Sequence, residues 1–139
     1  MARLVKEVMT TNPIRLSSSA PVIEAAKQMR NADVGAIIVE DGGRLSGIIT
    51  DRDIAIRAVA VGKDPEKTPV SEIVSRDLAT LSPNDEVDRA VKLMREKAVR
   101  RIPVIEGDRA VGIVSLGDLA IERDASSALG QISAAPPNQ

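Results

Sequence analysis

Two stretches of the sequence each place a hydroxyl side chain three residues before a carboxylate, Thr50 before Asp53 and Ser115 before Asp118. Both pairs follow an apolar run typical of a strand and stand where a helix is expected to begin. A helix start leaves backbone N–H groups unpaired and carries the positive end of the helix dipole, so the hydroxyl can help to bind a phosphate. The same pairs can instead serve only as helix caps, because hydroxyl and carboxylate satisfy the free N–H groups themselves. Both interpretations stay open at this point.

The missing residue types exclude most enzyme mechanisms. The 139 residues include no Cys, His, Trp, Tyr or Phe. This excludes Cys–His and Ser–His–Asp catalysis, zinc sites and aromatic platforms for nucleic-acid bases. No two carboxylates form a convincing acid–base pair. The sequence therefore predicts that the protein is not an enzyme and has no metal site and no catalytic cofactor.

Charge and hydropathy argue against polyanionic and membrane partners. The 19 Lys and Arg side chains oppose 20 Asp and Glu side chains, for a formal net charge of -1, so no basic field for nucleic acid or an anionic membrane is expected. No apolar run approaches the roughly 18 residues of a membrane span. The N-terminal residues lack the apolar core of a signal peptide, and no cysteine can form a disulfide. We expect no nucleic-acid partner, no membrane partner and a cytoplasmic location.

The elements that position the two hydroxyl–carboxylate pairs come from an internal duplication. A shift of 65 positions aligns residues 5–57 with residues 70–122 without a gap, and 19 of the 53 aligned positions are identical. Two unrelated stretches of this length would share on the order of three, so the chain contains two copies of one unit. We expect repeats at 1–62 and 70–123, a linker at 63–69, and a mostly disordered tail at 124–139 in which a short helix can form.

Each copy shows the same order of hydrophobic periods, which predicts a β-α-β-β-α unit. The expected strands are 14–16, 36–39 and 45–49 in the first copy and 79–81, 102–105 and 110–114 in the second, and the expected helices are 22–29, 87–94 and those that start at Asp51 and near Gly117. A unit of this size buries little apolar surface alone. We therefore expect an α/β (α+β) fold in which the two repeats pack about a pseudo-twofold axis.

The two copies resemble cystathionine-β-synthase (CBS) domains. The stretches Gly47–Asp53 and Gly112–Asp118 fit the family signature G-x-x-[TS]-x-x-D, and the segments Met9–Pro13 and Arg100–Val104 fit as well. The resemblance covers about residues 5–123 and is that of a tandem CBS pair, or Bateman module. Such pairs bind adenosine-containing ligands in the clefts between their repeats. The resemblance implies a regulatory module that senses an adenine nucleotide (AMP, ADP or ATP), with or without Mg²⁺.

The resemblance also implies the residues of each cleft, because a cleft combines the [TS]-x-x-D motif of one copy with the strand start of the other. The aspartate would accept hydrogen bonds from both ribose hydroxyls, a guanidinium would contact the phosphate, and adenine would lie between aliphatic side chains. One cleft would comprise Ser115, Asp118, Arg101, Thr10, Asn12, Pro13 and Ile14, and the other Thr50, Asp53, Arg52, Ser75, Asp77 and Ala79. Only the former has Arg101, since Ala36 takes its place in the first copy.

Two alternatives to a nucleotide sensor stay open. The first is a structural dimerisation module whose clefts stay empty, and the second is a sensor of an S-adenosylmethionine or NAD-type ligand. The helix after Asp53 is apolar around most of its circumference, which predicts a second packing partner. We expect a homodimer whose interface includes Ile56, Val59 or Ala60. Nearly all of the chain belongs to the pair, so any regulated target is expected to be a separate protein.

Overall fold

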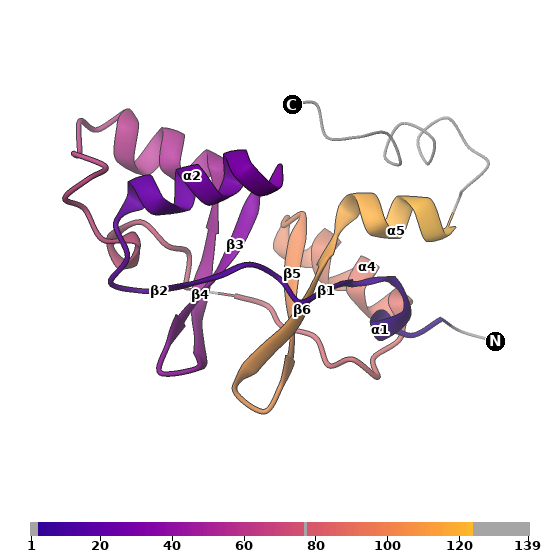
Figure 1. The fold of residues 1–139 in the computed structure, drawn as a ribbon. Coiled ribbons are helices and arrows are strands. Elements are labelled where there is room, and N and C mark those ends of the chain that lie inside the picture. The colour runs from indigo at the N-terminus through magenta and orange to yellow at the C-terminus, as the bar shows by residue number, and fades with distance from the viewer. Residues whose placement is uncertain (1–2, 77, 124–139) are drawn as a thin grey trace. The chain divides into compact units, whose positions relative to one another are not determined.

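A computed structural model of the chain describes residues 3–76 and 78–123, which form two compact units (Figure 1). The first unit contains the described residues from 14 to 78, and the second contains residues 3–13 together with residues 79–123. The N-terminal residues are therefore part of the same unit as the second copy of the repeat. The tail expected at residues 124–139 lies outside the described residues.

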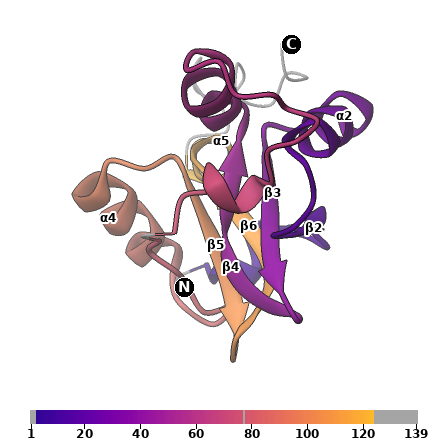
Figure 2. The ribbon, with the colours of Figure 1, turned by 90° about the vertical axis from the view of Figure 1, so that its left-hand side faces the viewer.

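The first unit is a three-stranded sheet with helices, in the strand order β2–β3–β4. Strand β2 runs parallel to β3, and β3 and β4 form an antiparallel hairpin. The hairpin turn lies at the opposite end of the sheet from α2 (Figures 1 and 2). The elements are β2 (Arg15–Ser17), α2 (Val22–Ala32), β3 (Ala36–Asp41), β4 (Arg44–Thr50), α3 (Asp51–Asp53), η1 (Ile54–Val59) and η2 (Val70–Glu72).

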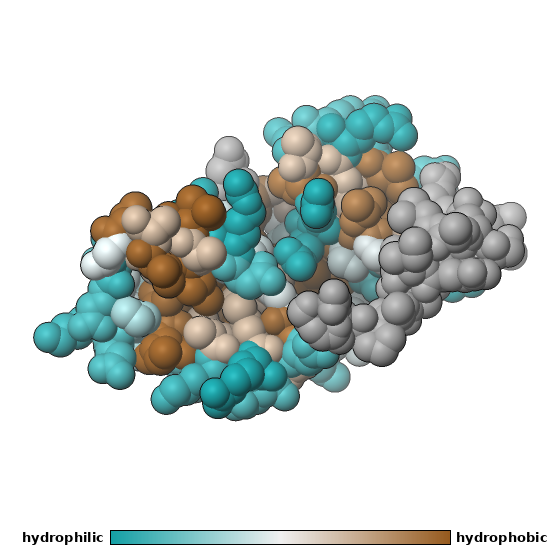
Figure 3. Space-filling view, turned by 90° about the horizontal axis from the view of Figure 1, so that it is seen from above, coloured by the Kyte–Doolittle hydropathy of each residue, from teal (hydrophilic) through white to brown (hydrophobic). Residues whose placement is uncertain are grey.

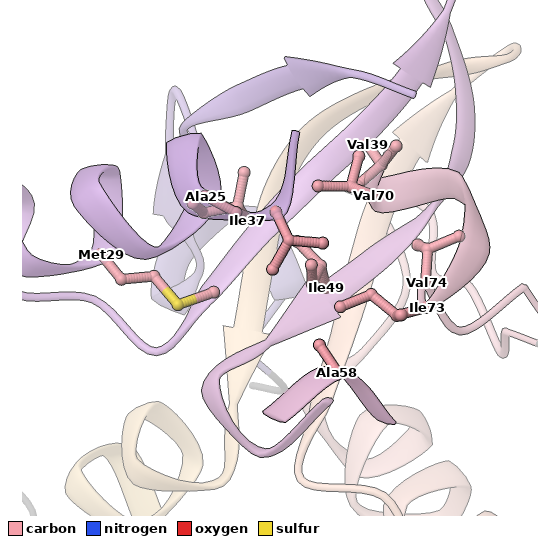
Figure 4. Packing of buried hydrophobic residues seen from close by; sticks show 10 residues of the cluster. Ala25, Met29, Ile37, Val39, Ile49, Ala58, Val70, Ile73 and Val74 are labelled. Atoms are coloured by element: carbon pink, nitrogen blue, oxygen red, sulfur yellow. The ribbon is translucent and has the colours of Figure 1, made fainter. Parts of the chain in front are cut away.

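The core of the first unit joins one face of the sheet to the helices. Figure 4 shows side chains from α2, β3, β4, η1 and the η2 turn gathered into one cluster. The apolar residues of α2 face this cluster at the spacing that the sequence predicts. Burial of each Ile or Val contributes about 1.5–3 kcal/mol to stability. The buried members are Val22, Ala25, Met29, Ile37, Val39, Ile49, Ala58, Val70, Ile73 and Val74.

The second unit also combines a three-stranded sheet with helices, but its strand order is β1–β6–β5. Both pairings in this sheet are antiparallel. The elements are α1 (Val5–Val8), β1 (Thr10–Thr11), α4 (Val87–Lys97), β5 (Arg101–Glu106), β6 (Arg109–Ser115) and α5 (Leu116–Arg123). The predicted α/β class is confirmed, as are the two hairpins and the helices that precede them.

The prediction of a strand at residues 79–81 is wrong, because only a single parallel bridge between Leu81 and Val104 forms there. In the first unit, the N–H of Ile38 donates to the carbonyl of Ile14 at 2.9 Å and starts the β2–β3 pairing. The equivalent of Ile38 in the second copy is Pro103, which has no N–H to donate. The ladder therefore loses its first hydrogen bond and shortens to a bridge.

The helix expected from Asp51 onward changes its geometry after one turn. The α3 turn gives way to η1, a π-helix of six residues. The N–H of Ala60 donates to the carbonyl of Ala55 at 2.9 Å, one residue further back than in an α-helix. The predicted helix is present, but its winding differs from the regular period that the sequence implies.

Each sheet also receives a segment from the other copy of the repeat. Strand β1 pairs with β6, with Thr10 opposite Ile113. In the first unit Ser75 takes the equivalent place, and it exchanges two backbone hydrogen bonds of 3.1 Å with Ile48. Because each segment precedes the first strand of its own copy, we call them the lead-in segments, residues 9–11 and 74–76.

A glycine in each sheet allows the lead-in segment to approach. A Cβ atom on Gly47 would lie 2.5 Å from the carbonyl oxygen of Ser75, and one on Gly112 would lie 2.5 Å from Met9 Sδ and 2.9 Å from the carbonyl oxygen of Thr10. Real Cβ atoms essentially never come so close, so both positions require glycine. The glycine of the G-x-x-[TS]-x-x-D pattern thus allows the backbone of the lead-in segment to pack against the strand.

We predict that Gly47→Ala lowers the free energy of unfolding by about 1–3 kcal/mol, the usual cost of overpacking. Gly112→Ala should lower it less, because its nearest neighbour is the flexible side chain of Met9 rather than a carbonyl. Chemical denaturation followed by circular dichroism measures both, with Ser46→Ala on the same strand as the control. A Gly47→Ala protein as stable as the control would contradict the docking role.

Candidate functional site

Both hydroxyl–carboxylate pairs form reciprocal caps at their helix starts. The N–H of Thr50 donates to Asp53 Oδ2 at 2.9 Å, and the N–H of Asp53 donates to Thr50 Oγ1 at 3.1 Å. Ser115 and Asp118 repeat this pattern at the same two distances. Capping is therefore confirmed as one role of each pair. It occupies only one oxygen of each carboxylate, so it leaves room for a second role.

The second carboxylate oxygen has different surroundings in the two copies. Asp53 Oδ1 lies 3.8 Å from Nε of Arg57, one helical turn further on. Among the side chains of residues 3–76 and 78–120, Asp118 Oδ1 has no hydrogen-bond or ion-pair partner, and Asp118 is half-buried. Sequence reasoning missed Arg57, although its spacing of four residues from Asp53 is the signal for such a pair. Of these two aspartates, Asp118 is the one with a carboxylate oxygen that no described side chain engages.

The β1–β6–β5 sheet brings three of the predicted site residues to one face. Arg101 is the direct cross-strand partner of Ser115, and Thr10 is the partner of Ile113, two residues before Ser115. Directly opposed residues and residues two apart on a strand project from the same face, with opposed Cβ atoms about 4.5–5.5 Å apart. The face therefore carries a guanidinium and two hydroxyls.

The start of α5 places Asp118 beside this face. The N–H of Leu116 donates to the carbonyl of Arg100 at 2.8 Å, which fixes the first residue of α5 against the start of β5. Asp118 then lies in the first turn, held by its hydrogen bonds with Ser115. We call Thr10, Arg101, Ser115 and Asp118 the Ser115 site.

No strand pairing or cap joins the other three residues predicted for this cleft to the Ser115 site. Asn12 follows β1 in a left-handed conformation, with φ of 50°, and is exposed. Pro13 is buried and is the last residue of this segment in the second unit. Ile14 begins the first unit. The structure thus groups four of the seven predicted residues by strand pairing or capping.

The other predicted set is partly assembled in the first unit, where we call Thr50, Asp53 and Ser75 the Thr50 site. Ser75 pairs with Ile48, two residues before Thr50, as Thr10 does in the second unit. The cross-strand partner of Thr50 is Ala36, so no guanidinium stands there. Among the remaining predicted residues, Arg52 is exposed in α3, Ala79 belongs to the second unit, and Asp77 lies outside the described residues.

Neither a metal centre nor a membrane span is found in the described part of the chain. No three His, Cys, Asp or Glu side chains within residues 3–76 and 78–123 are grouped as a metal site requires. In the same residues, no helix has the length and apolar character needed to cross a bilayer.

Comparisons with known proteins agree with this architecture. A family model described as CBS domain matches the chain twice, at residues 5–59 and 70–123. The CBS domain-containing protein YhcV of Bacillus subtilis is 44% identical over 133 residues, which cover 93% of this chain and 94% of that protein.

Two solved structures are similar over most of their length. The CBS domain pair of protein MJ0100, in complex with 5'-methylthioadenosine and S-adenosyl-L-methionine, is 29% identical, with a TM-score of 0.81 over 91% of this chain and 100% of that chain. A hexameric CBS-CP12 protein from bloom-forming cyanobacteria is 31% identical, with a TM-score of 0.80 over 89% of this chain and 74% of that chain.

We predict that Asp118→Ala lowers the free energy of unfolding by about 0.5–2 kcal/mol, because it removes the acceptor for the N–H of Ser115. Asp118→Asn keeps an acceptor oxygen and should lose less. Urea denaturation of both variants separates the cap from any role in binding. Equal losses for the Ala and Asn variants would mean that capping by the side-chain oxygen does not support the start of α5.

Proposed function

The chain belongs to the CBS domain family, and we propose that it is a regulatory module that binds an adenosine-containing ligand at the Ser115 site, with an adenine nucleotide as the ligand. One observation carries this proposal: Arg101 and Ser115 are paired across two strands beside the open carboxylate oxygen of Asp118. The guanidinium of Arg101 and the hydroxyl of Ser115 can bind a phosphate, and the carboxylate of Asp118 can accept hydrogen bonds from the ribose.

The chemistry of the Ser115 site supports a phosphorylated ligand. The guanidinium of Arg101 can make paired hydrogen bonds to phosphate oxygens. The start of α5, a helix of eight residues, adds its positive dipole end and backbone N–H groups. Asp118 Oδ1 can accept from a ribose hydroxyl while Oδ2 keeps the cap. AMP, ADP or ATP satisfies all three, and Mg²⁺ would accompany a polyphosphate.

A second candidate ligand is S-adenosylmethionine, which is bound in the solved structure of MJ0100. It shares the adenosyl group and would use the same carboxylate of Asp118. Its methionine part carries two cationic groups, the sulfonium and the amino group, against one carboxylate, so Arg101 attracts it less than it attracts a phosphate. An NAD-type ligand would again use the phosphate contact. The charge at Arg101 therefore favours a nucleotide over S-adenosylmethionine.

The family and the missing residue types support the proposed regulatory role. The B. subtilis relative is named only as a CBS domain-containing protein, and the sequence has no Cys or His for nucleophilic or acid–base catalysis. We propose that ligand binding changes the packing of the chain and so its contact with a separate target protein, in the cytoplasm. A structural module without ligand is the competing hypothesis.

An apolar surface on η1 supports the proposed homodimer. Ile56 and Val59 are 52% and 65% exposed, and Val61, just beyond η1, is 63% exposed. Figure 3 shows apolar side chains gathered on the left, over the part of the first unit that contains α2 and η1. A contiguous exposed patch of this kind is typical of an interface. The hexameric neighbour is an example of a CBS protein that assembles.

We predict that Arg101→Ala weakens AMP binding about tenfold to hundredfold, which is about 1.5–3 kcal/mol for charge-assisted hydrogen bonds, and leaves adenosine binding unchanged. Isothermal titration calorimetry with both ligands is the measurement, and Arg100→Ala, which removes the exposed neighbouring cation, is the control. An equal loss for adenosine would mean that Arg101 does not contact the phosphate. No binding of either ligand to the unmodified chain would overturn the proposed function.

We predict that Val59→Glu converts a dimer to a monomer, because it buries an unpaired charge in the proposed interface. Light scattering measures the mass against the 14.7 kDa of one chain. Val34→Glu, at an exposed apolar position outside η1, should stay dimeric. A monomeric unmodified chain, or a folded Val59→Glu dimer, would contradict an interface on η1.

A further inference from the structure

Arg57 links the carboxylate of the Thr50 site to the segment that precedes Ser75. Its Nε lies 3.8 Å from Asp53 Oδ1, and its Nη1 donates to the carbonyl of Ile73 at 3.4 Å. The side chain of Asp53 is only 11% exposed, whereas that of Arg57 is 53% exposed. The cation therefore stands on the solvent side of a nearly buried carboxylate.

The pair leaves Asp53 without an unengaged oxygen. Oδ2 accepts the cap hydrogen bond from Thr50, and Oδ1 faces Arg57. A ribose hydroxyl that donates to Oδ1 shares this oxygen with the guanidinium, whose positive charge 3.8 Å away weakens the oxygen as an acceptor. The hydroxyl therefore gains less at Asp53 than it would at a carboxylate without a neighbouring cation.

The second copy lacks this cation. The residue at the position of Arg57 is Glu122, whose charge has the opposite sign. A glutamate cannot neutralise Asp118, so that carboxylate keeps its affinity for hydrogen-bond donors. The two sites therefore share their caps and differ in what stands four residues after the aspartate.

We propose that Arg57 is a specificity-determining residue that occupies Asp53 Oδ1 and thereby weakens ribose binding at the Thr50 site. This inference rests on the proposed function, since it assumes that the aspartate of each site binds the ribose. It makes the chain asymmetric: the Ser115 site is filled first, and the Thr50 site fills only at higher ligand concentration. The asymmetry arises from a side chain outside the G-x-x-[TS]-x-x-D motif.

The test isolates the Thr50 site in a chain that carries Asp118→Ala. Adenosine is the probe, because it is neutral and the loss of a cation does not change its long-range attraction. Adding Arg57→Gln should tighten adenosine binding by up to about fivefold, the range for releasing a partly exposed ion pair. Lys63→Gln is the matched control, because it breaks another ion pair of the same unit, with Glu72 at 3.4 Å.

The outcomes separate this inference from the proposed function. A gain with Arg57→Gln that disappears when Asp53→Asn is added supports the proposal, provided that Lys63→Gln gives none. Unchanged or weaker adenosine binding with Arg57→Gln overturns it, and weaker binding would make Arg57 a ligand contact. AMP binding to the unmodified chain is measured in parallel. If that also fails, the proposed function falls together with this inference.

Discussion

The close approach of a lead-in segment to a glycine is the constraint on which each unit depends. At Gly47 a Cβ atom would meet the carbonyl of Ser75, and at Gly112 it would meet Met9 and the carbonyl of Thr10. Because the lead-in segment can lie there, β1 completes its sheet. Thr10 then pairs with Ile113, which is two residues from Ser115 on the same face. The same strand, β6, runs directly into α5 and its cap. In the second unit, the contact between Gly112 and the lead-in segment therefore supports both the packing of the sheet and the arrangement of the Ser115 site.

The two copies share hairpins and helix caps, and single side chains then change the strand pairing and the charge of each copy. Pro103 in place of Ile38 removes one donor and shortens a strand to a bridge. Arg101 in place of Ala36 adds a cation opposite the capping hydroxyl. Arg57, where the other copy has Glu122, engages the second oxygen of Asp53. Each change is local and leaves the caps intact, so ligand preference can diverge between the sites without loss of the fold.

The sequence predicts local features well because their causes are local. Hairpins and the apolar face of α2 follow from hydrophobic period, and the caps follow from the spacing of Ser115 and Asp118. The strand predicted at residues 79–81 does not form, because Pro103, more than twenty residues away, has no N–H to donate to it. The grouping of residues 3–13 with the second copy depends on long-range pairing, which periodicity does not encode. The Arg57–Asp53 contact had a readable spacing, but its distance and burial required the structure.

Equilibrium dialysis against AMP tests most directly whether the Ser115 site binds an adenine nucleotide. The chain has no Trp, Tyr, Phe or Cys, so ultraviolet absorbance by adenine reports bound nucleotide with little background from protein. We expect about one AMP retained per chain at ligand concentrations well below those that fill the Thr50 site, and loss of that AMP in Asp118→Ala. An unmodified, folded chain that retains no AMP, or an Asp118→Ala chain that retains as much as the unmodified chain, would contradict the proposed function of the Ser115 site.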